Sequence, residues 1–540
     1  MATVAAENAI LAFREALGEA AVDTQSETIG RYARSSSGTS TIPICILYPE
    51  STAHVQALVR AASEHGIVLY PISRGKNWGY GDACAPMSGA AIVDLSRMNR
   101  IVEVNTDLAY AIIEPGVTQG QLYEYLQRNK TGLWCDVTGA GLEASFVGNT
   151  LDRGFGHTRY GDHFLSTCGM EIVLADGRVL HTGYGHYPNA QAAHVYRYGV
   201  GPFIDGLFCQ SNFGIVTKIT MWLMPEPEAF CFFYVVVDDP DGVGPLIDAL
   251  RPLRLNGTLP ATLHIGNDLR ILSAKQGYPW QESGGRTPLS REIRKDMIRS
   301  IRAGAWNMAS ALTGTRDQVR AGKKALRNAL GGVGKLRFVD DSKLSWAWRV
   351  SGWLSGLGMG DSLRELLIAM RPLFGTLKGQ PFDDAMRGAQ WRLQKESGVP
   401  TADPLDVGAG IRWLSPVLPT TGRHANEVLS IVEPIFQRHG FDLLVTFTMI
   451  NERAMIAVMN VAFDTSLPDE AAAASSCYLE SLQALIEKGY IPYRTGHAGM
   501  RLLHSQDDVF WDVATSIKSA LDPQDIISRG RYLPPLENPE

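Results

Sequence analysis

The most constraining feature of this sequence is a glycine-rich turn that directly follows a predicted strand. The apolar residues 67–72 predict the strand, and the turn continues from Ser73 to Gly81. Glycine lets the main chain approach a ligand closely, and successive backbone N–H groups in such a turn can converge on an anion such as pyrophosphate. The turn is neither the Gly-x-Gly-x-x-Gly of dinucleotide-binding folds nor a Walker loop. A single turn of this kind is structural more often than functional, so it predicts an anion site only together with others.

The size of the chain predicts at least two lobes, because 540 residues are too many for one hydrophobic core. Charged residues make up 20% of the sequence, which is ordinary for a globular protein, and the net charge is −6. Basic residues are scattered apart from short runs such as 291–302, which predicts a solvated helix face. Without a clustered basic face, we expect no nucleic-acid partner.

The sequence also lacks the signals for membranes and disulfides. No apolar stretch approaches the length of a membrane span, and the first ten residues lack the pattern of a secretory signal. The cysteines are odd in number, are far apart and form no Cys-x-x-Cys pair, which argues against a disulfide framework and against zinc. We therefore expect a cytoplasmic protein without a membrane partner. The cysteines are Cys45, Cys84, Cys135, Cys168, Cys209, Cys231 and Cys477.

The order of predicted elements indicates an α+β protein. From residue 42 to about 225, short strands alternate with capped helices, and Asp176-Gly177 predicts a tight hairpin turn within 170–180. After Pro225 we expect a second α+β lobe over 226–490. It contains a strand at 230–237, amphipathic helical stretches around 290–330 and 360–375, and two strands at 443–450 and 454–461. We expect residues 491–540 to return to the first lobe.

Several further motifs recur with the first turn in a fixed order. Together they resemble the vanillyl-alcohol oxidase and p-cresol methylhydroxylase family in sequence and spacing through most of the chain. The segments that carry this resemblance are 71–81, 93–101, 114–118, 148–156, 160–163, 205–217, 224–227, 250–255 and 414–417.

The resemblance implies a two-lobed FAD-binding fold in which the first lobe, 1–225, binds FAD and the second is a cap that forms the substrate pocket. The turn that begins at Ser73 would hold the pyrophosphate, and Arg531 would lie near the flavin. The full set of cofactor-binding residues implied in this way is Ser73, Arg74, Gly75, Lys76, Asn77, Gly81, Gly139, Gly148, Asn149, Ile215 and Arg531.

The same resemblance implies that Tyr80, Tyr493 and Arg494 hold the oxygen of a phenolic substrate and favour its phenolate. Ionising a phenol near neutrality requires about 4 kcal/mol of differential stabilisation, because its reference pKa is about 10. Two hydroxyl donors and a guanidinium could supply that amount, since each hydrogen bond to a charged group contributes about 1.5–3 kcal/mol. Phenolate favours hydride loss from the para benzylic carbon and gives a quinone methide. Without the other motifs, these side chains would predict only buried structural tyrosines and an ion pair.

The sequence departs from the family at two positions. Ile411 occupies the usual position of covalent flavin attachment and cannot form that bond, so we predict dissociable FAD. The family aspartate near flavin N5 corresponds here to about Gly139 or Ala140. Asp136 and Asp152 are possible substitutes, although each could equally cap a turn. We include Asp152 among the catalytic candidates.

Three histidines lie within matching motifs, namely His157, His163 and His497. We expect His163 to be a structural hydrogen-bonding residue. His497, three residues after Arg494, is the better candidate for contact with the substrate.

The leading hypothesis is therefore an FAD-dependent oxidase or hydroxylating dehydrogenase of a 4-alkylphenol, a 4-alkenylphenol or a 4-hydroxybenzyl alcohol. One alternative keeps the fold but takes a bulkier phenolic natural product or a lignin-derived dimer. Another is a flavoprotein electron-transfer subunit without turnover of its own, against which the retained Tyr80, Tyr493 and Arg494 argue. The expected partners are a phenolic small molecule, an acceptor such as oxygen or a cytochrome, and a second copy of the chain, since the family usually forms at least dimers.

Overall fold

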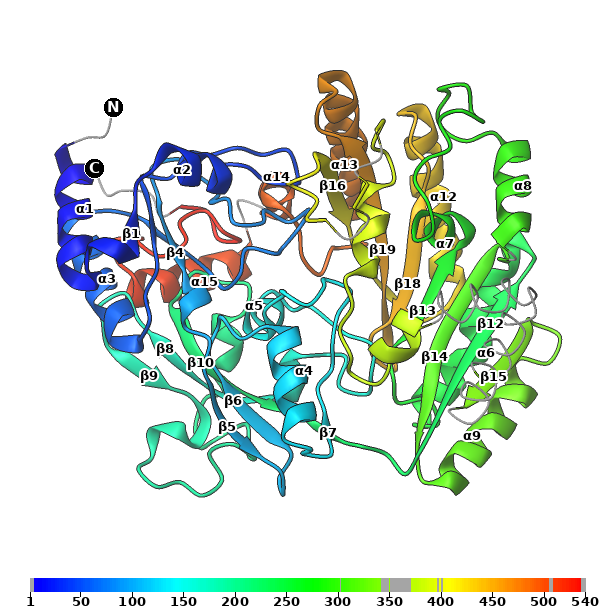
Figure 1. Ribbon diagram of the computed structural model, residues 1–540, viewed down its shortest axis with the longest axis horizontal. Coiled ribbons are helices and arrows are strands. Elements are labelled where there is room, and N and C mark those ends of the chain that lie inside the picture. The colour runs from blue at the N-terminus through cyan, green and yellow to red at the C-terminus, as the bar shows by residue number, and fades with distance from the viewer. Residues whose placement is uncertain are drawn as a thin grey trace.

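The protein forms two lobes that lie side by side (Figure 1). The computed structural model describes residues 4–301, 303–340, 349, 371–395, 398–399, 402–504 and 508–535. Both ends of the chain lie on the first lobe, which holds the N-terminal elements and α15 (Val509–Leu521). Within these residues no helix has both the length and the apolar character to cross a membrane, and no three His, Cys, Asp or Glu side chains come together as a metal site.

The first lobe contains two sheets. The smaller has the order β1-β2-β4-β3, with β2, β4 and β3 parallel, and the larger is antiparallel with the order β5-β6-β10-β8-β9. Asp176-Gly177 closes the β8–β9 hairpin as predicted, with Gly177 at φ +81°. The strands are β1 (Val22–Asp23), β2 (Cys45–Leu47), β3 (Leu69–Ile72), β4 (Ala91–Asp94), β5 (Ile101–Asn105), β6 (Tyr110–Ile113), β8 (Thr167–Val173), β9 (Val179–His181) and β10 (Ile215–Trp222).

Capped helices cover these sheets. Ser51 accepts a hydrogen bond from His54 N at the start of α3, and Thr118 accepts one from Gln121 N at the start of α4. A short ladder, β7 (Leu133–Trp134) with β11 (Met224–Pro225), precedes the crossing to the second lobe. The helices of this lobe before the crossing are α1 (Val4–Leu17), α2 (Ser26–Tyr32), α3 (Thr52–His65), α4 (Gln119–Arg128) and α5 (Phe146–Leu151).

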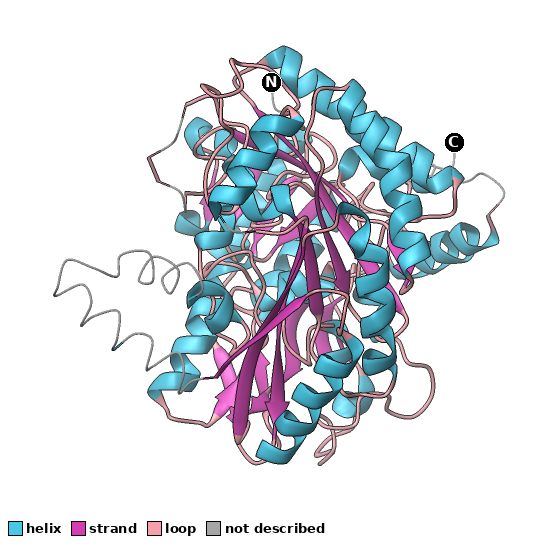
Figure 2. Cartoon of the chain, turned by 90° about the vertical axis from the view of Figure 1, so that its right-hand side faces the viewer, coloured by secondary structure: helices cyan, strands magenta, loops and turns pink. Residues whose placement is uncertain are grey.

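The second lobe is built on one large antiparallel sheet with the order β15-β12-β14-β13-β18-β19-β16, and β17 also pairs with β19. Its long strands run beneath a layer of helices (Figure 2). The strands are β12 (Ala229–Val237), β13 (Leu263–Asn267), β14 (Trp306–Gly314), β15 (Lys335–Asp340), β16 (Ala409–Leu414), β17 (Val417–Pro419), β18 (Leu444–Met449) and β19 (Ala454–Asp464).

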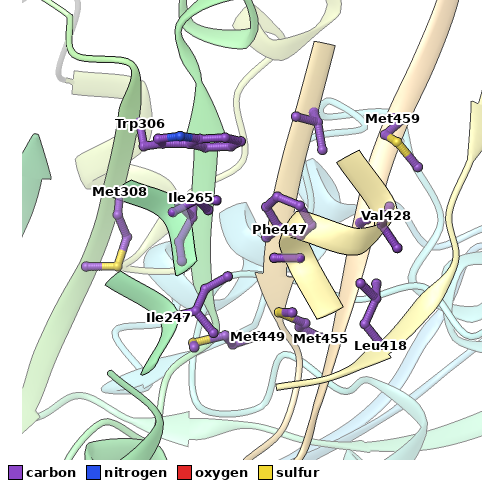
Figure 3. Packing of buried hydrophobic residues seen from close by; sticks show 14 of the residues in the cluster. Ile247, Ile265, Trp306, Met308, Leu418, Val428, Phe447, Met449, Met455 and Met459 are labelled. Carbon is purple, nitrogen blue, oxygen red and sulfur yellow. The ribbon is translucent and has the colours of Figure 1, made fainter. Parts of the chain in front are cut away.

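Between the helices and one face of this sheet lies the largest hydrophobic core. Trp306, Ile265, Phe447 and Met449 pack there from neighbouring strands, against Ile247 of α6 (Figure 3). The helices of this lobe are α6 (Val243–Leu255), α7 (Asp268–Ser273), α8 (Arg291–Ile301), α9 (Arg316–Ala329), α12 (Gly422–Arg438) and α13 (Pro468–Glu487).

One prediction for this lobe was wrong. The stretch 290–330 is not continuously helical, because β14 separates α8 from α9. The sequence of β14, Trp-Asn-Met-Ala-Ser-Ala-Leu-Thr-Gly, has one β-branched residue, so only its pairing with β12 and β13 makes it a strand. α8 has no buried residue, in agreement with the expected solvated face. Of the predicted helix at 360–375, residues 360–370 lie outside the described residues and 371–375 are helical.

The C-terminal segment contacts the first lobe. Leu69 N donates to Ile526 O at 2.7 Å and Ser528 N donates to Leu69 O at 2.8 Å, so the segment pairs alongside β3. Ile527 belongs to the core under α3, and α14 (His497–Met500) leads from the second lobe towards α15. We propose 1–225, 226–490 and 491–540 as the boundaries of the three parts. All seven cysteines are buried.

Candidate active site

A cavity between the two lobes is lined by residues from both and from the C-terminal segment. The turn at 73–77 and α5 contribute from the first lobe, β16 and β19 from the second, and Tyr493, Arg494 and Arg531 from the end of the chain. The fold therefore brings together segments that are more than 400 residues apart in sequence.

The turn at 73–77 presents an unpaired row of backbone donors to this cavity. Within the described part of the chain, none of its five N–H groups donates to a protein acceptor. Gly75 has φ +63°, and a Cβ there would lie 2.9 Å from the Ala83 Cβ, so this position requires glycine. Free N–H groups in such a turn can bind an anion, and the pyrophosphate of FAD stays the predicted ligand.

The two basic side chains of this turn are already ion-paired. Arg74 contacts Glu143, and Lys76 Nζ lies 2.5 Å from an oxygen of Asp403, which belongs to the second lobe. Their charges are therefore largely compensated, and the backbone carries most of the anion binding that this turn offers. The pair between Lys76 and Asp403 also joins the turn to the cap.

The other predicted cofactor residues lie around the same cavity, with one exception. Gly148 contacts the turn closely, because a Cβ there would lie 3.1 Å from Ser73 Oγ. Gly81 is absent from the described lining; a Cβ there would lie 2.7 Å from His497 Nε2. The predicted cofactor residues in the lining are Ser73, Arg74, Gly75, Lys76, Asn77, Gly139, Gly148, Asn149, Ile215 and Arg531.

Tyr80, Tyr493 and Arg494 meet at one wall of the cavity. The guanidinium carbon of Arg494 lies 4.1 Å from the Tyr80 ring centroid and 5.2 Å from that of Tyr493. The Tyr80 hydroxyl is within 2.8 Å of Ser415 Oγ, and Phe155 packs against Tyr493 with ring centroids 5.7 Å apart. Residues 80, 415 and 493 come from three distant segments, so only the complete fold forms this wall.

Asp152 links this wall to the rest of the cavity. Its carboxylate lies 3.4 Å from Arg494 Nη1 and 2.9 Å from Arg531 Nη2, and it accepts hydrogen bonds from Asn77 Nδ2 and the Tyr532 hydroxyl. A carboxyl group with four donors fixes the positions of its partners. We call Tyr80, Tyr493, Arg494, Arg531 and Asp152 the grip cluster.

The electrostatics of the grip cluster favour binding of an anion. Burial alone lowers the pKa of Arg494, but Tyr493, Tyr80 and Asp152 together raise it above its ordinary value. Burial raises the pKa of Tyr493 well above that of free tyrosine. Arg494 therefore stays cationic and Tyr493 stays a hydroxyl donor. The two arginines and Asp152 sum to one net positive charge, which matches one phenolate.

The cap contributes a second wall through strand alternation. Side chains alternate between the two faces of a strand, so Leu414 enters the helix-covered core while Ile411 and Trp413 line the cavity. On β19, Met459 enters the core and Val458 lines the cavity in the same way. We call the cavity-lining residues Ile411, Trp413, Val458 and Arg270 the cap wall. The side chain at the usual flavin attachment position is thus an isoleucine that faces the cavity.

Asp136 does not serve as the second acidic candidate. It lies outside the described lining and is bound by His163 Nε2 at 2.7 Å and by the N–H groups of His157 and Thr158. Although burial raises its pKa, the hydrogen bond from His163 and that residue's charge hold it below its ordinary value. His163 also contacts Asn149 Oδ1, so both residues hold the loop together, as expected for His163.

His497 is also not among the described residues that line the cavity. Its ring lies edge-on to Tyr70, with centroids 6.5 Å apart, and packs against Gly81. Burial, with a smaller contribution from Arg531, lowers its pKa to about 3, so it is neutral. This position does not support the hypothesis of substrate contact.

Arg270 and the role of Ser415 were not predicted from the sequence. Arg270 lies in α7 and lines the cavity. It belongs to none of the recognised motifs, and the packing of α7 against α8, β13, β18 and η7 (Asp384–Gln390) places it there. Ser415 falls within a recognised motif, but its contact with Tyr80 depends on how the two lobes meet.

Comparison with known proteins agrees with this architecture. A family model described as an FAD binding domain matches residues 43–183. The chain is 38% identical to 1'-carboxy-chondrochloren decarboxylase of Chondromyces crocatus over the whole of both chains. It is 32% identical to the 4-cresol dehydrogenase [hydroxylating] flavoprotein subunit of Pseudomonas putida, over 97% of this chain and 94% of that one. The crystal structure of p-cresol methylhydroxylase with substrate bound superposes with a TM-score of 0.88 at 30% identity, covering 100% and 99% of the two chains. The predicted two-lobed α+β FAD-binding fold is confirmed.

Proposed function

Since the chain belongs to the p-cresol methylhydroxylase family of FAD-dependent oxidoreductases, we propose that it removes a hydride from the benzylic carbon of a para-substituted phenol bound as phenolate. The observation that carries this proposal is the grip cluster, in which Arg494 lies 4.1 Å from the Tyr80 ring and contacts Tyr493. A protein that only transferred electrons would have no need for such a cluster.

The residues of the grip cluster prepare the substrate. Arg494 and the tyrosine hydroxyls stabilise the phenolate, and Asp152 holds Arg494 and Arg531 in place. FAD, when bound, supplies the acceptor for the hydride. The phenolate electrons then delocalise towards the para carbon, which leaves a quinone methide. Phe155 and Trp413 both line the cavity, and their large apolar rings would limit the access of water to the substrate ring.

The test is anaerobic mixing of the purified holoprotein with 4-ethylphenol, 4-propylphenol, eugenol and vanillyl alcohol. We expect the flavin absorbance near 450 nm to bleach with at least one of them. Larger phenolic dimers in the same panel test the alternative of a bulkier substrate. If the protein holds FAD and none of these phenols reduces it, the proposed reaction is wrong.

The fate of the quinone methide distinguishes two versions of this function. Water addition requires a base near the benzylic carbon, and the position of the family aspartate corresponds to about Gly139 or Ala140, which both line the cavity. Loss of carbon dioxide from the quinone methide requires no base. Similarity to a protein named as a decarboxylase favours this second version. Identification of products as alcohols or as vinylphenols separates the two.

FAD is proposed to be dissociable because Ile411 faces the cavity at the usual attachment position. After acid precipitation of the holoprotein, we expect all flavin absorbance in the supernatant and none in the pellet. Flavin that stays with the denatured protein would overturn this proposal.

The electron acceptor and the assembly complete the proposal. After anaerobic reduction, addition of oxygen or of a cytochrome identifies which of them reoxidises the flavin. Light scattering of the purified holoprotein tests the proposed homo-oligomer of at least two chains.

A further inference from the structure

Arg270 differs from the other arginines that line the cavity. Arg74, Arg494 and Arg531 are each ion-paired with a carboxylate. Arg270 also lines the cavity, but its guanidinium has no ion pair or hydrogen bond to any residue that the structure describes. Arg270 is only partly buried, and a cation that faces a cavity without a carboxylate partner can bind an anionic ligand.

The surrounding residues hold Arg270 in place without neutralising it. Asn267 caps α7 by accepting a hydrogen bond from Arg270 N at 2.9 Å. The neighbouring Asp268 is already bound by Arg294, with Arg294 Nε 2.8 Å from its oxygen. The guanidinium carbon lies 5.9 Å from the centroid of Trp413. A Cβ at Gly388 would lie 3.0 Å from Arg270 Nη1, so this glycine leaves room for the guanidinium.

Two buried arginines of the same lobe have protein partners for part of their guanidinium groups, although one nitrogen of each has none. Arg254 donates to Leu259 O at 2.6 Å and to Ala261 O, and Arg392 lies 2.7 Å from Glu470. Burial lowers the pKa of Arg270, and no nearby carboxylate opposes that effect. Arg270 therefore lacks the partners that Arg254 and Arg392 have, and its side chain lines the cavity.

We propose that Arg270 binds a carboxylate on the para side chain of the substrate, so that the enzyme acts on phenols with a carboxylated side chain. This inference rests on the proposed function. The grip cluster has one net positive charge for the phenolate, and Arg270 adds one more for the carboxylate. The ring of Trp413 lies beside the Arg270 guanidinium. Its Nε1 donates a hydrogen bond at 2.9 Å to the backbone oxygen of Trp78, which is two residues before Tyr80. The two cationic sites therefore border one binding space.

The chemistry of such a substrate explains why no base is needed beside the benzylic carbon. Loss of a hydride from the benzylic carbon of 3-(4-hydroxyphenyl)propanoate, with the bound FAD as the two-electron acceptor, leaves a quinone methide. The bond to the carboxylate carbon then breaks, and its electron pair forms the side-chain double bond while the ring regains the phenolate. The products are carbon dioxide and 4-vinylphenol. Arg270 orients the carboxylate and holds it until it leaves.

The experiment compares 3-(4-hydroxyphenyl)propanoate with its uncharged isostere 3-(4-hydroxyphenyl)propanamide. In the wild-type holoenzyme we expect kcat/KM for flavin reduction to be higher for the acid. In Arg270→Met the ratio of acid to amide falls about 10- to 100-fold, because one charge-assisted bidentate contact is lost. Arg270→Lys retains the charge and recovers part of the ratio. Arg299→Met, an exposed arginine of α8, is the matched control and leaves the ratio unchanged.

Binding measurements separate failure of this inference from failure of the proposed function. Calorimetry with both ligands reports the acid preference even if neither compound reduces the flavin. If the amide reduces the flavin while the acid-to-amide ratio is the same in Arg270→Met as in the wild type, Arg270 is not the carboxylate site and the proposed function stands. If neither compound reduces the flavin but Arg270→Met still loses affinity for the acid alone, the site is correct and the proposed reaction is wrong. If Arg270→Met is purified without bound FAD, Arg270→Gln takes its place in the same comparison.

Discussion

The grip cluster and the cap wall line the same cavity but satisfy their charges in opposite ways. In the grip cluster, Arg494 and Arg531 share Asp152, which Tyr532 and Asn77 also bind. In the cap wall, Arg270 lies against Trp413 without a carboxylate partner among the described residues. A preorganised network suits the group that every substrate of the family presents, whereas an unpaired cation suits a group that only some substrates carry.

The largest effect is expected in the grip cluster. Arg494→Met removes the cation beside the phenolate and leaves Asp152 with a single arginine, so kcat/KM for flavin reduction should fall about 10³-fold for acid and amide substrates alike. Stopped-flow reduction of the holoprotein provides the measurement. A loss confined to the acid substrate would mean that Arg494 binds the carboxylate rather than the phenolate.

Tyr493→Phe should lower kcat/KM by about 10²-fold, since it removes one donor to the phenolate and keeps the ring that packs on Phe155. Because burial raises the pKa of Tyr493 well above 10, the wild-type hydroxyl stays protonated, and no decline should arise from its ionisation between pH 6 and 10. Rates of flavin reduction across this range check both statements. Tyr187→Phe, at an exposed tyrosine, is the control.

An alkaline decline below pH 10 in the wild type that disappears in Tyr493→Phe would contradict this assignment. It would mean that Tyr493 ionises in the working range and cannot be a permanent donor to the phenolate.

The two walls also differ in how far the sequence predicts them. Tyr80, Tyr493 and Arg494 lie in recognisable motifs, and the structure places all three around one cavity as expected. The turn at 73–77 was predictable because its glycine pattern reflects a local backbone requirement. Such features depend on residues that are close in sequence.

Arg270 could not be predicted in this way. Its position depends on the register of β13 against β14 and β18, on the packing of α7, and on room left by Gly388, more than 100 residues away. The strand β14 was missed for a related reason, because its residues have no clear strand preference and long-range pairing makes it a strand. Long-range packing therefore sets the part of the site that selects substrates.

A smaller effect is expected on the ratio of products when a carboxylate is introduced at Ala140. Ala140 lines the cavity and is partly exposed, so an aspartate there can remain ionised. Ala140→Asp should raise the ratio of hydroxylated to decarboxylated product by several-fold, because a carboxylate can activate water. Product analysis by chromatography gives the ratio. Ala140→Asn has the same shape without the base and should not change it; an equal change in both variants would show that shape, not basicity, decides the product.

The smallest effect concerns the support of the grip cluster rather than its contacts with the substrate. Ser36 N and Oγ both donate to Asp82, Gly79 N donates to Ser36 Oγ at 2.8 Å, and Ile411 N donates to Ser36 O at 2.7 Å. Asp82 thus anchors the turn that presents Tyr80 and connects it with the cap wall.

Asp82→Asn should make thermal stability less dependent on pH. Burial raises the pKa of Asp82 from 3.8 to about 7, so between these values the folded protein holds a proton that the unfolded chain lacks. This contribution to the free energy of unfolding is fully present below pH 4, declines as pH rises towards 7, and is lost above it. Asparagine does not titrate and tolerates the φ of 54° at this position, so the difference in Tm between pH 5 and pH 8 should shrink by a few degrees. Differential scanning fluorimetry of the holoprotein measures it, with Asp296→Asn at an exposed aspartate of α8 as the control. An unchanged difference would mean that Asp82 is already ionised at pH 5, and that the turn beneath Tyr80 is held by an anion like the rest of the grip cluster.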